Sequence, residues 1–330
     1  MTGGGCTAKV WRMRDKDQTS RIEQPGHNSH RPRSYVVAGQ QIETKTIEGG
    51  LHLVATPIGN LRDITLRALE VLAGVHVIAC EDTRVTRKLL DHYGIDTPLT
   101  PYHEHNASTA RPKLLARLAA GDSIALVSDA GTPLISDPGF KLVRAVHEAG
   151  HNVSAVPGAS AALSALIISG LPTDRFFFEG FLPAKEGQRR TRIAELAPIP
   201  SSLILFETGS RLARSLADLA QGLGARDATI CRELTKVYEE ARRGDLASLA
   251  NDYANTPPPR GEIVIVVAPP LAETGELDSD ALDDLLRRAM GRVSMKDAVG
   301  EVAAATGRPR REVYQRALEL CDKHDDSAKN

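Results

Sequence analysis

The stretch Val127-Ser-Asp-Ala-Gly-Thr-Pro-Leu-Ile-Ser-Asp-Pro-Gly139 decides the fold class. It follows Ser123–Val127, a short aliphatic run that is typical of a buried strand rather than a helix. Asp137 as an N-cap and Pro138 at the first helical position predict that a helix begins next. Asp129–Pro133 is therefore expected to form a loop at the carboxyl end of a parallel strand, where open α/β sheets bind ligands. An ordinary βα loop is the alternative.

The composition of the 330-residue chain excludes several classes of protein. Its formal net charge is −1, so no global basic field indicates nucleic-acid binding. The cysteines are far apart and form no C-x-x-C pair, which favours a reducing compartment over a disulfide scaffold or a zinc site. No apolar run approaches the ~20 residues of a membrane span, and no signal peptide is evident. We expect a soluble, cytoplasmic protein without a membrane partner.

The first 50 residues are polar, are broken by Gly and Pro, and have no periodicity that would bury a core. Such a composition predicts a disordered extension over residues 1–50. A basic arm that grips RNA is the alternative. The ordered chain is expected to begin at Leu51.

Two more strand ends are expected at the same edge of the sheet. Leu51–Ala55 runs into Thr56-Pro-Ile-Gly-Asn60, and His151–Val156 runs into a loop that continues through Pro157 to Ala161. Neither loop has the G-x-G-x-x-G fingerprint, and nothing matches a P-loop. A nicotinamide or nucleoside-triphosphate cofactor is therefore not supported.

A charged segment, Cys80-Glu-Asp-Thr-Arg84, follows the predicted strand Val75–Ala79. Neighbouring side chains in an extended segment point to opposite sides. One of the two carboxylates is therefore expected at the site, while the other pairs with Arg84. A solvated helix start capped by Thr83 is the alternative.

The segment Pro101-Tyr-His-Glu-His-Asn106 gathers polar side chains before the next predicted helix. His103 and His105 are two positions apart and have no third ligand in a familiar metal motif. Hydrogen bonding or substrate contact is favoured over metal binding, and we expect no metal site.

Six motifs together resemble the tetrapyrrole methylase superfamily, the class III S-adenosylmethionine methyltransferases. They are Val54–Asp63, Cys80–Arg84, Tyr102–Asn106, Val127–Gly139, Val156–Ser160 and Gly261–Val264. The resemblance extends over about residues 51–323. It implies an α/β protein with two α/β domains, 51–172 and 173–270, a cofactor cleft between them, and usually a homodimer. Helical periodicity after residue 279 adds a small helix-turn-helix-like domain over 279–324.

The resemblance also implies roles for residues on the predicted edge, with S-adenosylmethionine as the cofactor. The expected cofactor-binding residues are Pro57, Gly59, Asp129, Ala130, Gly131, Thr132, Pro133, Pro157, Gly158 and Ser160. The candidates for accepting or orienting a hydroxyl proton are Glu81, Asp82 and His103, and those for positioning ribose or phosphate are Arg84 and Asn106. A carboxylate needs a raised pKa to act as an effective base.

The implied reaction is methylation of the ribose 2′-oxygen of a cytidine in the decoding centre of 16S ribosomal RNA, within the small subunit. No DNA partner is expected. Two alternatives stay open: a superfamily member that methylates a small molecule such as a tetrapyrrole, and a non-catalytic RNA-binding protein of ribosome assembly. The protein's main tasks would be to align the reacting atoms and to supply a base that accepts the hydroxyl proton.

Three features of the second half bear on this expectation. Gly209 and Ser210 replace the Pro and His that are typical of the family between Glu207 and Arg211, which puts any role of that His in doubt. A cationic run, Pro183–Arg192, is either a solvated helix face or a phosphate contact. Four arginines on or near the final helix predict either RNA contact or simple packing; they are Arg308, Arg310, Arg311 and Arg316.

Overall fold

The computed structural model of this protein describes residues 33–136, 139–270, 279–306 and 308–327. The expected extension over residues 1–32 and the capping roles of Asp137 and Pro138 lie outside the described residues. The helix that they were expected to open begins at Phe140, directly after Gly139.

The first sheet is parallel throughout and holds five strands in the order β5-β4-β6-β3-β7. Its strands are β3 (Gly50–Val54), β4 (Val77–Cys80), β5 (Leu99–Pro101), β6 (Ser123–Val127) and β7 (Val153–Val156). Every residue of the central strand β6 is buried, as the continuous aliphatic run predicts for a strand covered on both faces. Because all five strands are parallel, their carboxyl ends meet at one edge, where the ligand loops were expected.

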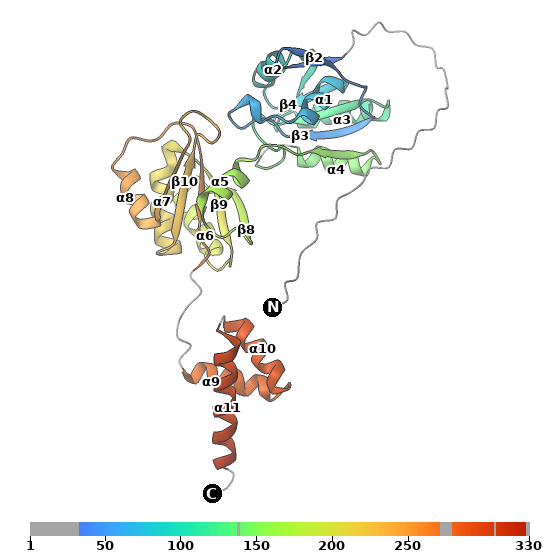
Figure 1. The fold of residues 1–330 in the computed structure, drawn as a ribbon. Helices are drawn as coiled ribbons and strands as arrows, with labels where there is room; N and C mark the ends of the chain where they lie inside the picture. Colours follow the sequence, from blue (N-terminus) through green and yellow to red (C-terminus); the bar gives the residue numbers. More distant parts are fainter. Residues whose placement is uncertain (1–32, 137–138, 271–278, 307, 328–330) are drawn as a thin grey trace. The chain divides into compact units, whose positions relative to one another are not determined.

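Four helices cover the two faces of this sheet (Figure 1). They are α1 (Leu66–Gly74), α2 (Thr83–His92), α3 (Ala107–Ala119) and α4 (Phe140–Glu148), and a 3-10 turn, η1 (Leu61–Asp63), precedes α1. Alternate residues of β6 enter different cores: Ala125 packs with α1 and α2, whereas Leu126 packs with α3 and α4. The sheet is thus the middle layer of a three-layer α/β domain, as predicted.

The prediction that residues up to 50 form a disordered extension is wrong for residues 33–50. An antiparallel hairpin, β1 (Ser34–Val37) and β2 (Gln40–Glu43), precedes the first sheet. Tyr35 is only 2% exposed and packs in the core that contains α1 and α2. One buried aromatic side chain thus anchors a segment whose overall composition is polar.

The second sheet also has five strands, in the order β11-β10-β12-β9-β8. Its strands are β8 (Phe176–Phe181), β9 (Ser202–Thr208), β10 (Asp227–Arg232), β11 (Glu240–Asp245) and β12 (Glu262–Val267). Only β8 and β9 pair in parallel; the other pairs are antiparallel. Three helices pack against one face of this sheet: α6 (Glu186–Leu196), α7 (Gly209–Leu223) and α8 (Leu246–Ala254). This is the second α/β domain that the resemblance implied.

The helix α5 (Ala161–Ser169) corrects the expected boundary at residue 172, because it packs against the second sheet. Ala165 and Leu166 are buried against Ile204 and Val264 of that sheet. The second domain therefore begins at the loop after β7, and α5 covers the face that α6, α7 and α8 leave open.

Three helices follow in the C-terminal part, as the periodicity predicted: α9 (Ser279–Met290), α10 (Met295–Thr306) and α11 (Arg310–Ser327). They share a small core of their own that includes Leu286, Val299 and Val313. Arg316 reaches across this bundle with hydrogen bonds of 2.6 and 2.9 Å to the carboxylate of Asp283, whose side chain is 7% exposed.

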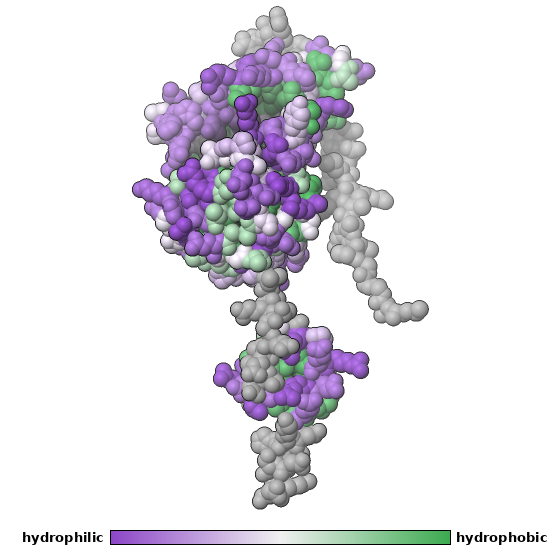
Figure 2. Space-filling model, turned by 90° about the vertical axis from the view of Figure 1, so that its left-hand side faces the viewer, coloured by the Kyte–Doolittle hydropathy of each residue, from purple (hydrophilic) through white to green (hydrophobic). Residues whose placement is uncertain are grey.

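The visible face of the molecule is mostly hydrophilic, with apolar residues gathered in limited patches (Figure 2). Among the helices that the structure describes, none is long and apolar enough to cross a membrane.

Gly209 has a structural reason to stand where the family typically has Pro. A Cβ atom at this position would lie 1.7 Å from the carbonyl oxygen of Pro259, so a larger residue requires the backbone to shift. We expect Gly209→Ala to lower the free energy of unfolding by about 1–3 kcal/mol, the usual cost of overpacking. Gly187→Ala is the matched control, because Gly187 lies in α6 with no atom within 4 Å of its would-be Cβ and should gain about 0.5–1 kcal/mol. Urea unfolding of both variants measures the difference, and equal effects would contradict this reason.

Candidate active site

Hydrogen bonds join three of the loops that the sequence placed at one edge. The amide of Thr56 donates to the carbonyl of Gly131 at 2.9 Å, and the amide of Gly131 donates back at 3.0 Å. The Thr132 hydroxyl donates to the carbonyl of Ala159 at 3.1 Å. The loops after β3, β6 and β7 therefore form one connected rim.

Gly131 is required at the centre of this rim. Its φ is +80°, a conformation that favours glycine, and a Cβ would lie 3.1 Å from the side chain of Ile58. The positive φ and the adjoining side chain of Ile58 both disfavour a larger residue at this position.

Two adjoining cavities open at the rim. Most of the expected cofactor-binding residues line the first cavity, the second, or both. The first, here named the rim cavity, is lined by Asp129, Ala130, Gly131, Thr132 and Ser160 together with residues of the second sheet. The second is lined by Pro57 and Gly59 and shares Asp129 and Ala130 with the first.

Three of the expected cofactor-binding residues, Pro133, Pro157 and Gly158, line neither cavity. Gly158 has a packing role instead, since a Cβ there would lie 2.9 Å from the Cβ of Ala55. Its small size lets the loop after β7 lie against the end of β3.

The rim cavity also contains residues that reasoning from the sequence missed. They come from the β6–α4 loop and from the second sheet: Ile135, Ser136, Phe181, Phe206, Glu207, Glu262, Ile263 and Val264. Phe181 stands at the end of β8 and is 50% exposed, which is unusual for a large aromatic side chain. The motif Gly261–Val264 contains three of these residues, Glu262 to Val264, but in the sequence it indicated only the resemblance to the family and no place in the site.

The lining of the rim cavity fits a cationic nucleoside such as S-adenosylmethionine. Phe181 and Phe206 offer aromatic surface on which an adenine ring can stack. Four carboxylates line the same cavity, those of Glu81, Asp129, Glu207 and Glu262, and its described lining residues include no Lys, Arg or His. Arg211 neutralises Glu207, and the negative field of Glu81, Asp129 and Glu262 favours a positively charged sulfonium.

Glu81 is the candidate base that the geometry supports. It lines the rim cavity and also a neighbouring polar cavity that contains His103, so it stands where the two spaces adjoin. Burial raises the pKa of Glu81 above its ordinary value, and the charges of Asp129 and Asp82 raise it further, while His103 acts in the opposite direction. A carboxyl with a raised pKa is a more effective proton acceptor near neutral pH.

Asp82 and Arg84 serve the structure of the loop instead. Asp82 is the N-cap of α2 and accepts a hydrogen bond of 2.8 Å from the amide of Arg84, so the alternative of a capped helix start applies with Asp82 in place of Thr83. The side chain of Arg84, which is 87% exposed, pairs with the same carboxylate at 2.6 Å. Hydrogen bonds from Arg84 hold the pKa of Asp82 at about 2, which makes it a poor base.

Asn106 also has a local task, because both ends of its amide hold the loop before α3. Its Oδ1 accepts a hydrogen bond of 2.9 Å from the amide of His103, and its Nδ2 donates to the carbonyl of Pro101 at 3.0 Å. Of the five candidate catalytic residues, Glu81 and His103 therefore have the environment expected of groups that contact substrate. The amide of Asp82 donates to Asp129 at 3.0 Å and thereby ties the loop of Glu81 to the rim.

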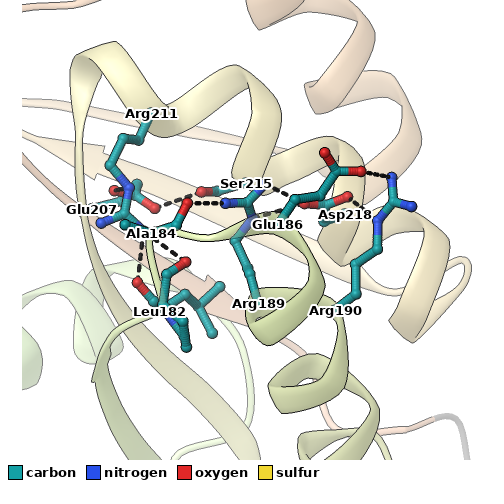
Figure 3. Close-up of polar contacts among 10 residues, drawn as sticks. Leu182, Ala184, Glu186, Arg189, Arg190, Glu207, Arg211, Ser215 and Asp218 are labelled. Carbon is teal, nitrogen blue, oxygen red and sulfur yellow. Dashed lines mark hydrogen bonds and ion pairs between the residues drawn. The ribbon is translucent and has the colours of Figure 1, made fainter.

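The three arginines of the cationic run Pro183–Arg192 are paired within the protein, as Figure 3 shows for Arg189 and Arg190. The side chain of Arg189 is 3% exposed and pairs with Asp218 at 2.6 Å, and Arg190 pairs with the same carboxylate at 2.8 Å. Arg192 makes two hydrogen bonds of 2.7 Å to Glu179. These arginines fasten α6 to the rest of its domain, and the expectation of a phosphate contact by them is not supported.

A second buried pair lies beside this network and holds Glu207 at the rim cavity (Figure 3). The carboxylate of Glu207 accepts hydrogen bonds from the amide of Thr208 at 2.8 Å and the hydroxyl of Ser215 at 2.5 Å. Arg211 pairs with it at 3.2 Å and donates to the carbonyl of Leu182. Glu207 and Arg211 thus form an ion pair although Gly209 and Ser210 replace the residues typical between them.

The arginines of the final helix divide into two groups. Arg316 is used inside the bundle by Asp283 and Glu319. Arg310, Arg311 and Lys296 instead surround a shallow hollow beside Tyr314, which is 46% exposed. Cations around an exposed aromatic ring are the composition expected of an RNA-contact surface. Among the described residues, no cluster of His, Cys, Asp and Glu could hold a metal ion.

Two family models match this chain. Tetrapyrrole (corrin/porphyrin) methylases match residues 50–250, and the RsmI C-terminal HTH domain matches residues 276–320. The ribosomal RNA small subunit methyltransferase I of Mesorhizobium japonicum is 51% identical over 288 residues, 87% of this chain and 97% of that protein. The protein of the same name from Escherichia coli O157:H7 is 45% identical over 276 residues, 82% of this chain and 96% of its own. The solved structure of the methyltransferase CobJ matches this chain with a TM-score of 0.51. The match covers 67% of this chain and 94% of the CobJ chain. At 18% sequence identity, the match shows a similar fold.

Proposed function

The chain belongs to the tetrapyrrole (corrin/porphyrin) methylase family, and from this premise we propose that it transfers a methyl group from S-adenosylmethionine to ribosomal RNA of the small subunit. The acceptor is the ribose 2′-oxygen of a cytidine in the decoding centre of 16S ribosomal RNA. In this proposal the enzyme works in the cytoplasm as a homodimer.

One observation carries the proposal: Glu81, a carboxyl with a raised pKa, lies between an acidic cavity with aromatic walls and a polar cavity with basic side chains. The first cavity suits the cofactor and the second suits a nucleotide. The names of the relatives and the matching C-terminal HTH model favour RNA over a tetrapyrrole as substrate.

The residues that would hold the cofactor are those of the rim cavity. Phe181 and Phe206 would contact the adenine, and the backbone of Ala130–Thr132 would contact the polar remainder. When bound, S-adenosylmethionine supplies a methyl group that is already electrophilic. The protein's own contribution is therefore alignment of the acceptor and removal of its proton.

Glu81 accepts the proton of the 2′-hydroxyl group as the oxygen becomes bonded to carbon. Its raised pKa makes it a suitable acceptor, and Asp129 keeps its loop in place through the amide of Asp82. His103, whose ring shares the polar cavity with Glu81, contacts the ribose and orients the hydroxyl group. A positioned base typically contributes about 10²- to 10⁴-fold to such a reaction.

The test is transfer of labelled methyl groups from S-adenosylmethionine. Purified small ribosomal subunits from cells that lack this gene should accept about one methyl group each, while a porphyrinogen precursor should accept none. Label on the porphyrinogen alone would establish the tetrapyrrole alternative. Absence of both transfer and cofactor binding by calorimetry would establish the non-catalytic alternative.

A further inference from the structure

The polar cavity that Glu81 shares with the rim cavity has cationic side chains, which the described lining of the rim cavity lacks. Arg111, Lys141, His103 and His105 line it, and we call it the Arg111 cavity. Its acidic residues are Glu81 itself and Glu104. Arg111 and Lys141 therefore lie on one side of Glu81, whereas the described lining of the rim cavity on the other side has carboxylates and no cation.

Two helices begin at the Arg111 cavity. Ala107 and Ser108 in the first turn of α3 line it, as do Gly139 and Phe140 at the start of α4. Neither helix has a side-chain hydrogen bond at its N-cap: the amide of Asn106 is used by the preceding loop, and Gly139 has no side chain. The amides of Ala107, Thr109 and Ala110 are bonded to backbone carbonyls, so α3 offers an anion the amide of Ser108, and both helices offer the positive ends of their dipoles.

The cavity also has two partly buried side chains, each with a nitrogen atom that is buried and without a partner. Among the described residues, Arg111 Nε and His103 Nδ1 are buried and have no hydrogen-bond partner. Leaving such a group unpaired costs about 1–3 kcal/mol, and more when the group is charged. A bound oxyanion would satisfy both the guanidinium and the amide of Ser108.

We propose that the Arg111 cavity binds a backbone phosphate of the RNA substrate, next to the ribose whose 2′-hydroxyl faces Glu81. The inference rests on the proposed function and names the part of the substrate that this cavity recognises. In RNA the 3′-phosphate is attached to the carbon beside C2′, so a base acting on the 2′-hydroxyl necessarily has a phosphate close by. The phosphate would fix the ribose in register with Glu81, because phosphate contacts position a nucleic acid without reading its sequence.

The test compares Arg111→Gln and Lys141→Gln with the wild type. Each variant is expected to weaken binding of small-subunit RNA to the enzyme loaded with S-adenosylhomocysteine by about tenfold, as loss of a charge-assisted hydrogen bond predicts. Each should also lower the slope of log Kd against log salt concentration by about 0.7–0.9. Binding of S-adenosylhomocysteine itself should change by less than about threefold, because neither residue lines the rim cavity, whereas kcat/KM for RNA should fall at least as much as the affinity does.

The control is Arg144→Gln, which removes a positive charge from the same helix α4 as Lys141. Arg144 pairs with Glu148 on the exposed face and does not line the cavity, so RNA affinity and salt slope should stay as in the wild type. Arg111→Lys keeps the charge and should recover part of the affinity. Because Lys141 is exposed, its variant is expected to fold even if Arg111→Gln does not.

The outcomes separate the two proposals. Variants that bind RNA with the wild-type Kd and salt slope would overturn the phosphate site, whether or not the enzyme methylates RNA. A wild type that binds RNA through Arg111 and Lys141 but transfers no methyl group would overturn the proposed function and leave the phosphate site in place.

Discussion

Replacing Glu81 by Gln is expected to lower kcat for methyl transfer by about 10²- to 10⁴-fold, the usual contribution of a general base. The amide keeps the shape of the carboxyl but cannot accept the proton. Binding of S-adenosylhomocysteine, measured by calorimetry, should stay close to the wild type, because Glu81 is one of four carboxylates around the rim cavity. Initial rates with small subunits measure the loss.

The control for this variant is Asp82→Asn. Asn is as good an N-cap as Asp, and the pKa of Asp82, about 2, already excludes it as the base. Its rate should stay within about tenfold of the wild type, well above the Glu81 variant. If the Asp82 variant lost more activity than the Glu81 variant, the assignment of the base would be refuted.

The pH dependence of the wild type follows from the same carboxyl. Only the ionised form of Glu81 accepts a proton, so kcat is expected to rise with pH through a pKa above the ordinary value for glutamate and then level off. The Gln variant should lose this acid limb. Because burial disfavours the charged form of Glu81, the variant should be at least as stable as the wild type, which distinguishes a functional loss from unfolding.

Replacing Asp218 by Ala is expected to lower the free energy of unfolding by about 3–5 kcal/mol, the cost of removing one partner from a buried ion pair. The substitution leaves Arg189 buried at 3% exposure without its carboxylate (Figure 3). It also removes the link that joins α6 to α7. Urea unfolding of the full chain measures the change.

The control for Asp218 is Glu148→Ala, which breaks the exposed pair between Arg144 and Glu148 on α4. Exposed pairs of this kind contribute about 0–1 kcal/mol. If both variants lost a similar free energy of unfolding, burial would not govern the strength of the ion pairs of Asp218 with Arg189 and Arg190.

Acid should reduce the stability that the ion pairs of Asp218 with Arg189 and Arg190 contribute. Burial acts to raise the pKa of Asp218, but hydrogen bonds from Arg190 and Arg189 outweigh it and lower the pKa below the ordinary value. The contribution of Asp218 is therefore fully present above its unfolded pKa and is lost as the pH falls through the lower folded pKa. The difference in stability between wild type and Asp218→Ala should shrink below about pH 4.

The sequence was sufficient to predict the first half of the site. Parallel strands bring their carboxyl ends to one edge, so Thr56, Glu81 and Gly131 could be placed together from three short aliphatic runs and the loops that follow them. Choosing between Glu81 and Asp82 was beyond the sequence, because the choice depends on burial and on which carboxylate caps α2.

The contribution of the second sheet could not be predicted in the same way. Phe181 and Phe206 come from strands that pair in parallel, and only the tertiary fold brings them to the loop of Gly131. The boundary before α5 was missed because its sequence is apolar on every side, so periodicity does not show which sheet it covers. The hairpin of β1 and β2 was missed because only a few side chains, Tyr35 and Val37 among them, anchor it in a segment of polar composition.

The central claim is that the rim cavity holds S-adenosylmethionine beside Glu81, and a crystal structure with S-adenosylhomocysteine tests it most directly. We expect the adenine against Phe181 and Phe206, whose rings contact each other edge to face with centroids 5.7 Å apart, the polar part of the ligand on the backbone of Ala130–Thr132, and the sulfur facing Glu81. Density for the ligand at another surface, or a rim cavity closed by its own side chains with the ligand excluded, would contradict the account.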